Sequence, residues 1–89
     1  MEVQFFSLLR RLTGTPTVEV EAETVRQALE RVVERFGPAV AAELFAATGE
    51  VKPLYNLLVN GRNIAFLDGL DTRLKPGDKL TIIPPAAGG

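Results

Sequence analysis

The chain has 89 residues, 46% of them hydrophobic, and its 10 Lys and Arg against 11 Asp and Glu give a formal net charge of −1. This length suits one compact domain, and a nearly neutral chain lacks the basic surface that holds nucleic acid or an anionic membrane. Cysteine and histidine are both absent, which excludes disulfides, thiolate metal sites and imidazole acid–base catalysis, so we expect a partner to supply the chemistry.

Two strands are expected near the amino end. The stretch "MEVQFF" (1–6), with "SLL" following, has the composition of an opening strand, and "TVEVEAE" (17–23) alternates apolar residues with glutamates. A period of two is typical of a strand with one face in water. "TGTP" supplies the turn between them. Phe5 and Phe6 alternate across the first strand, so one is expected in the core and the other outside it.

The strongest helix prediction covers residues 25–36, where apolar residues recur at spacings of three and four. Thr24 can cap the first turn, and Gln27 three residues later completes a capping-box pattern. The Gly-Pro pair at 37–38 ends this helix. A weaker helical stretch follows over residues 39–47.

Three further strands are expected, over residues 54–59, 62–66 and 79–83. Asn60-Gly61 predicts a hairpin between the first two, because both residues tolerate positive φ. Residues 67–72 have the composition of turns with a single tight helical turn. "KPGD" at 75–78 suits a type II turn that leads into the last strand.

This order of elements predicts an α+β domain in which one amphipathic helix covers one face of a small mixed sheet. The first and last strands are expected to be parallel neighbours, because the main helix provides the crossover that parallel pairing requires. We expect residues 1–83 to form the domain and residues 84–89 to form an extended tail.

Four stretches occur here in a familiar order: "FFSLLRRLTG", "VNGR", "LKPGDKLTIIPP" and a final "GG". In this arrangement the chain resembles the MoaD/ThiS family of β-grasp (ubiquitin-like) sulfur carriers, and most closely the small subunit of molybdopterin synthase. The resemblance covers both ends and the central hairpin, and leaves residues 39–53 unplaced. It implies a carrier subunit in molybdenum cofactor biosynthesis rather than an enzyme, with the catalytic residues on a partner.

The tail has a physical reading of its own. Pro84 and Pro85 lack backbone donors and hold φ near −65°, so the sheet stops and the chain leaves extended. From Pro84 to Gly89 the reach is at most about 20 Å, at roughly 3.3 Å per residue. Gly88 and Gly89 lack a Cβ, which lets the backbone pass a narrow channel and a nucleophile approach the last carbonyl.

The resemblance implies how this tail reacts. An E1-like activating enzyme of the MoeB type would use ATP to adenylate Gly89, and a sulfur donor of the cysteine desulfurase or rhodanese type would convert the adenylate to a thiocarboxylate. The chain itself would bind no cofactor. The tail, including Ala86 and Ala87, would then enter a large synthase subunit of the MoaE type.

The resemblance also implies a docking surface. It places Phe6 on the surface that meets the activating enzyme and the synthase, Ile83 beside the tail exit together with Pro84 and Pro85, and Arg10 as a polar anchor. Core packing is the alternative for Phe6. Asp68 and Asp71 are too few ligands for a Ca²⁺ loop, so we expect no metal.

Other functions remain open at this point. A ubiquitin-like modifier joined to lysines of target proteins would share the activation step, as would a carrier for tRNA or thiamine thiolation. A non-covalent interaction module would not use the tail. No apolar run has the length of a membrane span and the amino end lacks the order of an export signal, so we expect a cytoplasmic protein with no membrane partner.

Overall fold

The computed structural model describes residues 1–85. Its five strands form one sheet in the order β2-β1-β5-β3-β4. The strands are β1 (Glu2–Phe5), β2 (Thr17–Glu19), β3 (Asn56–Val59), β4 (Arg62–Asn63) and β5 (Lys79–Ile83). The helices are α1 (Ser7–Thr13), α2 (Val25–Phe36) and α3 (Pro38–Leu44), with the 3₁₀ turns η1 (Ile64–Phe66) and η2 (Gly69–Asp71).

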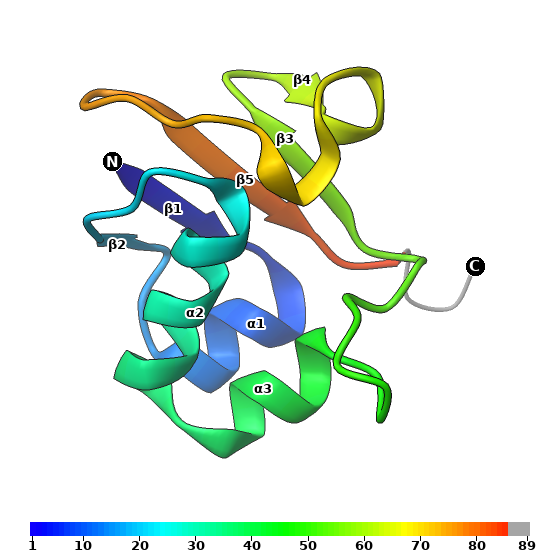
Figure 1. Ribbon diagram of the computed structural model, residues 1–89. Coiled ribbons are helices and arrows are strands. Elements are labelled where there is room, and N and C mark those ends of the chain that lie inside the picture. Colours follow the sequence, from blue (N-terminus) through cyan, green and yellow to red (C-terminus); the bar gives the residue numbers. More distant parts are fainter. Residues whose placement is uncertain (86–89) are drawn as a thin grey trace.

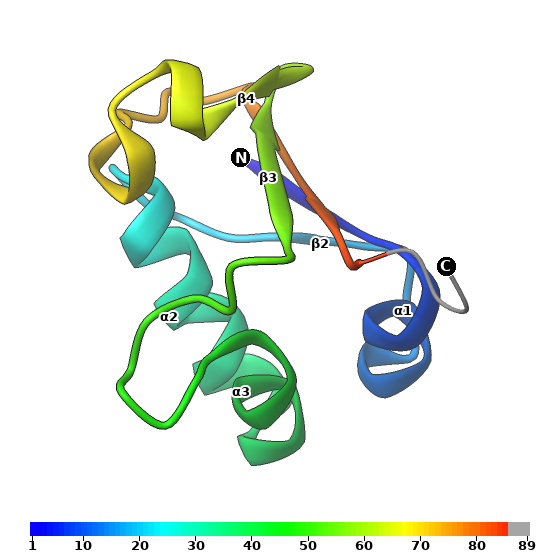
Figure 2. The ribbon, with the colours of Figure 1, turned by 90° about the vertical axis from the view of Figure 1, so that its right-hand side faces the viewer.

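The sheet is mixed, as predicted. β1 and β5 are parallel and central, with Val3 opposite Leu80 and Phe5 opposite Ile82, and the other pairs are antiparallel. The expected parallel pairing of the first and last strands is therefore confirmed. Figures 1 and 2 show all three α-helices on one side of this sheet, which leaves its other face uncovered.

The core lies between the sheet and the helices. Its largest fully buried side chains are Phe5, Leu9, Leu29, Leu44, Leu80 and Ile82. Phe5 meets Phe36 of α2 edge to face, with ring centroids 5.7 Å apart. The predicted α2 stripe is confirmed, because Val25, Ala28, Leu29 and Val32 are buried.

The predicted helix cap and turns are also present in the structure. Thr24 Oγ1 accepts the Gln27 N–H at 3.2 Å, and Gln27 Oε1 accepts the Glu23 N–H at 2.7 Å, one residue earlier than in a standard capping box. Asn60 and Gly61 have φ of 51° and 84° in the predicted hairpin. The Asp78 N–H donates to the Lys75 carbonyl at 3.0 Å, closing the predicted 75–78 turn.

The first strand is shorter than predicted, and "SLL" is not part of it. Ser7 has φ 52°, a left-handed conformation that ends the extended backbone, and α1 begins there. Leu9 packs into the core from α1, and Gly14, with φ 74°, ends the helix by donating its N–H to the Arg10 carbonyl at 2.9 Å. The prediction of one covering helix is thus incomplete, since α1 and α3 share the face that α2 covers.

Other boundaries also differ from the predictions, and the strand predicted over 54–59 begins at Asn56. The strand predicted over 17–23 ends at Glu19, and its backbone pairing stops at Val20, which exchanges two hydrogen bonds with Met1, the first residue of the chain described. The strand predicted over 62–66 gives way to η1 after Asn63, whose Oδ1 accepts the Ala65 N–H at 2.8 Å. The second helix runs from Pro38 to Leu44 and not to residue 47. Within residues 1–85, no helix is long and apolar enough to span a bilayer.

Candidate functional site

The ends of the neighbouring strands β1 and β5 carry two predicted docking residues, Phe6 and Ile83, to the surface. Phe5 and Ile82 face each other across the β1–β5 pair and are buried. The residues that follow them point away from the core because side chains alternate along a strand. Phe6 is accordingly 39% exposed and Ile83 is 36% exposed. Phe6 therefore does not pack in the core, whereas its contact with a partner stays a prediction.

These residues border a shallow apolar hollow of about 610 Å³, which we call the tail-base groove. Its lining residues are Phe6, Ser7, Leu54, Asn56, Ile83, Pro84 and Pro85. The lining contains no charged side chain, and its polar groups are those of Ser7 and Asn56. The groove therefore suits an apolar surface of a partner.

The groove forms where three segments distant in sequence meet. β5 lies between β1 and β3, so Ile83 stands opposite Asn56 at the start of β3 and next to the turn that leads into α1. Pro84 and Pro85 follow outside any strand. Figure 2 shows the end of β5 beside the start of α1. Pro84 and Pro85 line the groove. A protein that binds the residues directly after Pro85 therefore comes close to it.

Four of the predicted site residues, Phe6, Ile83, Pro84 and Pro85, thus meet in one place. Arg10 is exposed on α1, one turn beyond Ser7, and does not line the groove. The predicted tail residues Ala86, Ala87, Gly88 and Gly89 lie outside the described residues, so their roles stay predictions.

The sequence did contain a signal for one lining residue that prediction missed. Leu54 is 70% exposed and forms the third apolar wall of the groove. In the predicted strand 54–59, Tyr55, Leu57 and Val59 are the buried positions. The same alternation places Leu54 on the outer face. Ser7 gave no such signal, because its place depends on the unpredicted start of α1.

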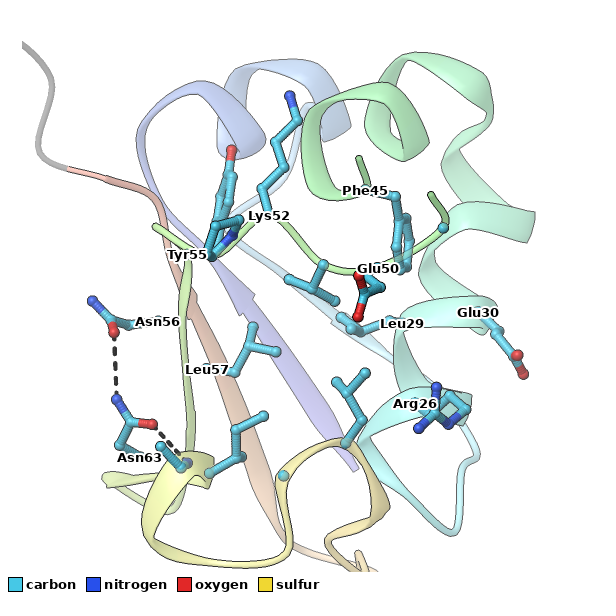
Figure 3. Close-up of a pocket in the computed structure, with 17 residues that line it drawn as sticks. Arg26, Leu29, Glu30, Phe45, Glu50, Lys52, Tyr55, Asn56, Leu57 and Asn63 are labelled. Atoms are coloured by element: carbon cyan, nitrogen blue, oxygen red, sulfur yellow. Dashed lines mark hydrogen bonds between the residues drawn. The ribbon is translucent and has the colours of Figure 1, made fainter. Parts of the chain in front are cut away.

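A second hollow lies away from the tail base, between α2, the segment 45–53, β3 and η1 (Figure 3). Its interior is apolar, with Leu29, Phe45 and Leu57 among its walls. On its rim, Arg26 pairs with Asp71 at 3.4 Å, and Asn63 Nδ2 donates to Asn56 Oδ1 at 3.4 Å. In residues 1–85, no three carboxylates gather as a metal site would require. Both rim contacts are exposed to solvent.

Comparison with known proteins decides the family. The sequence matches the profile of the ThiS family over residues 3–89, which includes the body, the tail-base groove and the tail. The chain belongs to the ThiS family. The predicted membership of the MoaD/ThiS sulfur carriers and the β-grasp, ubiquitin-like fold are thereby confirmed. This family consists of small sulfur-carrier and modifier proteins that are not themselves catalysts.

Several relatives share the full length of this ThiS-family protein. Small archaeal modifier protein 3 of Haloferax volcanii is 35% identical over 100% of this chain and 98% of its own. The solution structure of small archaeal modifier protein 1 from Methanosarcina acetivorans superposes with a TM-score of 0.89 at 34% identity, covering 99% of this chain and 94% of that one. A chain of the Amycolatopsis orientalis BexX/CysO complex gives a TM-score of 0.84 at 31% identity, covering 99% and 98%.

One structural neighbour bears on the predicted molybdopterin role of this ThiS-family protein. It is a putative molybdopterin converting factor, subunit 1, from Pyrococcus furiosus, with a TM-score of 0.74 at 27% identity, covering 96% of this chain and 95% of that one. The relatives reported above are more similar, and two of them are named as modifier proteins. The comparisons therefore favour the modifier alternative over the synthase subunit.

Proposed function

We propose that this chain is a sulfur carrier and protein modifier whose reacting group is the carboxylate of Gly89. One observation carries the proposal: the family match runs from residue 3 to residue 89, so it covers the sheet, the tail-base groove and the glycine pair together. The similarity to a small archaeal modifier protein over the whole chain supports the modifier role. In this proposal residues 1–83 are a rigid body and residues 84–89 are the tail that it presents.

The first step is activation by a partner. A carboxylate is a poor acyl donor, so an activating enzyme of the MoeB type catalyses its attack on the α-phosphorus of ATP, which releases pyrophosphate and leaves a Gly89 acyl-adenylate. ATP is a substrate of that enzyme, and this chain binds no cofactor of its own. We place the reaction in the cytoplasm.

Two fates of the adenylate then differ in the nucleophile. A persulfide from a cysteine desulfurase or rhodanese attacks the carbonyl carbon and displaces AMP, which gives an acyl disulfide. A second cysteine thiol, of the donor or of the activating enzyme, then attacks the donor's sulfur, so that the thiocarboxylate leaves and the two cysteines form a disulfide. A lysine amine of a target protein displaces the activated leaving group instead and gives an isopeptide bond. Both nucleophiles need an unhindered path to the last carbonyl, which Gly88 and Gly89 provide because they have no Cβ.

The body holds the tail and binds the partner. Pro84 and Pro85 keep the exit extended, and Phe6, Leu54 and Ile83 present apolar side chains around it. Large apolar side chains in a concave surface are typical binding hot spots. We propose that the activating enzyme covers this groove while the tail enters its active site.

An ATP–pyrophosphate exchange assay with the purified activating enzyme of the same organism tests the proposal. The wild-type chain should support exchange, and a chain with one residue appended after Gly89 should not, because the reacting carboxylate is displaced. A chain shortened to residues 1–85 serves as a second negative control, and unchanged denaturation midpoints show that both variants fold. Normal exchange with the appended chain would reject Gly89 as the reacting residue.

Products from native cells separate the two fates. Exact intact mass should show one oxygen replaced by sulfur for a carrier, and protein ladders that survive reducing, denaturing gels should appear for a modifier. The molybdopterin synthase role is the second candidate, favoured by the Pyrococcus furiosus neighbour. It predicts copurification with a large subunit of the MoaE type, and transfer of the sulfur to a pterin precursor.

A further inference from the structure

Helix α1 has two apolar side chains that residues 1–85 leave partly exposed. Leu9 points into the core, whereas Leu8 is 40% exposed and Leu12 is 39% exposed. These two leucines are four residues apart and so are neighbours on one side of the helix. Folding leaves this pair partly in water, so a partner that covers α1 would gain by burying the remaining apolar area.

The same helix carries an isolated positive charge. From Val3 to Val18 the only charged side chains are Arg10 and Arg11. Among residues 1–85, neither takes part in an ion pair, while Arg26, Arg31 and Lys79 are each paired with a carboxylate. Cations in the last turn also favour the helix dipole, but that effect does not account for the exposed leucines beside them.

The first residue of α1 lines the tail-base groove, so the helix leads away from it. α1 begins at Ser7, which lines the groove with Pro84 and Pro85. The segments that border the groove, residues 53–60 and 81–85, contain no charged side chain. The two arginines therefore supply the charge of the surface that leads away from the groove along α1.

We propose that Leu8, Arg11 and Leu12 form a second docking surface, which binds an acidic rim with an apolar centre on the activating enzyme that receives the tail. This inference rests on the proposed function. In this proposal the enzyme that encloses the tail also covers the groove, and its contact extends onto α1, because α1 starts at Ser7 in the groove lining. The leucines contribute burial of apolar area, and Arg11, with Arg10 beside it, contributes attraction that speeds the encounter and fixes its orientation.

The test compares two charge reversals in the exchange assay, each measured at low and at high salt. Arg11→Glu should raise the KM for the chain about tenfold at low salt with kcat unchanged, and the difference should shrink at high salt because the interaction is screened. Arg62→Glu makes the same charge change on β4, which lies at the opposite end of the molecule from α1 in both views. Its KM should stay within about twofold of the wild-type value.

A separate variant tests how much Leu8 contributes to binding of the activating enzyme. Leu8→Ala should raise KM at both salt concentrations, because burial of apolar area is not screened by salt. Denaturation midpoints establish that each variant folds, and Arg11→Ala replaces Arg11→Glu if the reversal prevents folding. A salt-independent KM for Arg11→Glu that equals that of Arg62→Glu would overturn the inference while the proposed function stands. Absence of exchange with the wild-type chain would instead remove the proposed function, and this inference with it.

Discussion

Neighbouring residues on β5 lie in different surroundings, because side chains alternate between the two faces of the sheet. Ile82 is buried under the helices, and Ile83 lies at the tail-base groove. The same contrast holds for Phe5, which meets Phe36, and Phe6, which borders the groove. A single residue step thus separates the contacts that hold the fold from those proposed to bind a partner.

Identical substitutions at these neighbours should have different effects. Ile82→Ala leaves a cavity in the core and should lower the free energy of unfolding by about 2–5 kcal/mol, a large part of the roughly 5–15 kcal/mol typical of a domain. Ile83→Ala should cost less than about 1 kcal/mol but raise the KM in the exchange assay. Urea denaturation and exchange kinetics measure the two effects, and equal losses of stability would contradict this assignment.

At the scale of elements, one side-chain network joins two turns that are far apart in sequence. Asn60 Nδ2 donates to Asp78 Oδ1 at 3.0 Å, and the Lys79 N–H donates to Asn60 Oδ1 at 3.0 Å. The other carboxylate oxygen of Asp78 accepts the Lys75 N–H at 2.7 Å. The Asn60 amide, followed by the Lys75 N–H, holds the pKa of Asp78 below its usual range. The β3–β4 hairpin is thereby fixed to the turn before β5.

Two substitutions of Asn60 separate its backbone role from its side-chain role. Asn60→Ala loses both hydrogen bonds and also places alanine at φ 51°, so it should lower the free energy of unfolding by about 1–3 kcal/mol. Asn60→Gly tolerates that φ and should cost less. Urea denaturation of the three proteins checks the order, and a glycine variant less stable than the alanine variant would contradict the argument from backbone conformation.

In the molecule as a whole, the segment that the sequence left unplaced packs into the core through Val40 and Leu44, and Tyr55 adds a side-chain hydrogen bond to it. Tyr55 precedes β3 and is buried, and its hydroxyl donates to Glu43 Oε1 of α3 at 2.6 Å. Burial first, and then the hydrogen bond and charge of Glu43, raise the pKa of the Tyr55 hydroxyl above its ordinary value. Tyr55 thus joins the helical layer to the sheet at the end of the 39–53 segment.

Because of this raised pKa, we expect the free energy of unfolding to depend on pH in the alkaline range. In the unfolded chain Tyr55 loses its proton near its ordinary pKa of about 10, whereas the folded chain retains the proton, so the free energy of unfolding should fall as pH rises above that value. Tyr55→Phe should remove this part of the pH dependence, seen as the difference between the two proteins. Because the chain has one tyrosine, tyrosinate absorbance reports its ionisation directly. Ionisation of folded wild-type protein near pH 10 would contradict the prediction.

Prediction from sequence succeeded where a local signal had one physical meaning. Thr24 and Gln27 cap α2 in almost the predicted manner, and the Asn60-Gly61 hairpin formed because few residues accept positive φ. α1 was missed because its leucines follow directly on a strand, and a short apolar run has no distinct period. The decisive feature there, the φ of 52° at Ser7, leaves no mark in the sequence.

The candidate site also has a part that local sequence signals predicted and a part that they did not. Pro84, Pro85 and the glycine pair predict an extended, unhindered tail from covalent geometry alone, and the order of motifs indicates the family, so sequence alone was enough to propose which part of the chain reacts. The pairing of distant strands decided what surrounds Pro84 and Pro85. Pairing of β5 between β1 and β3 brings Phe6, Leu54 and Ile83 together, and such long-range pairing depends on contacts between segments that no local pattern of residues records.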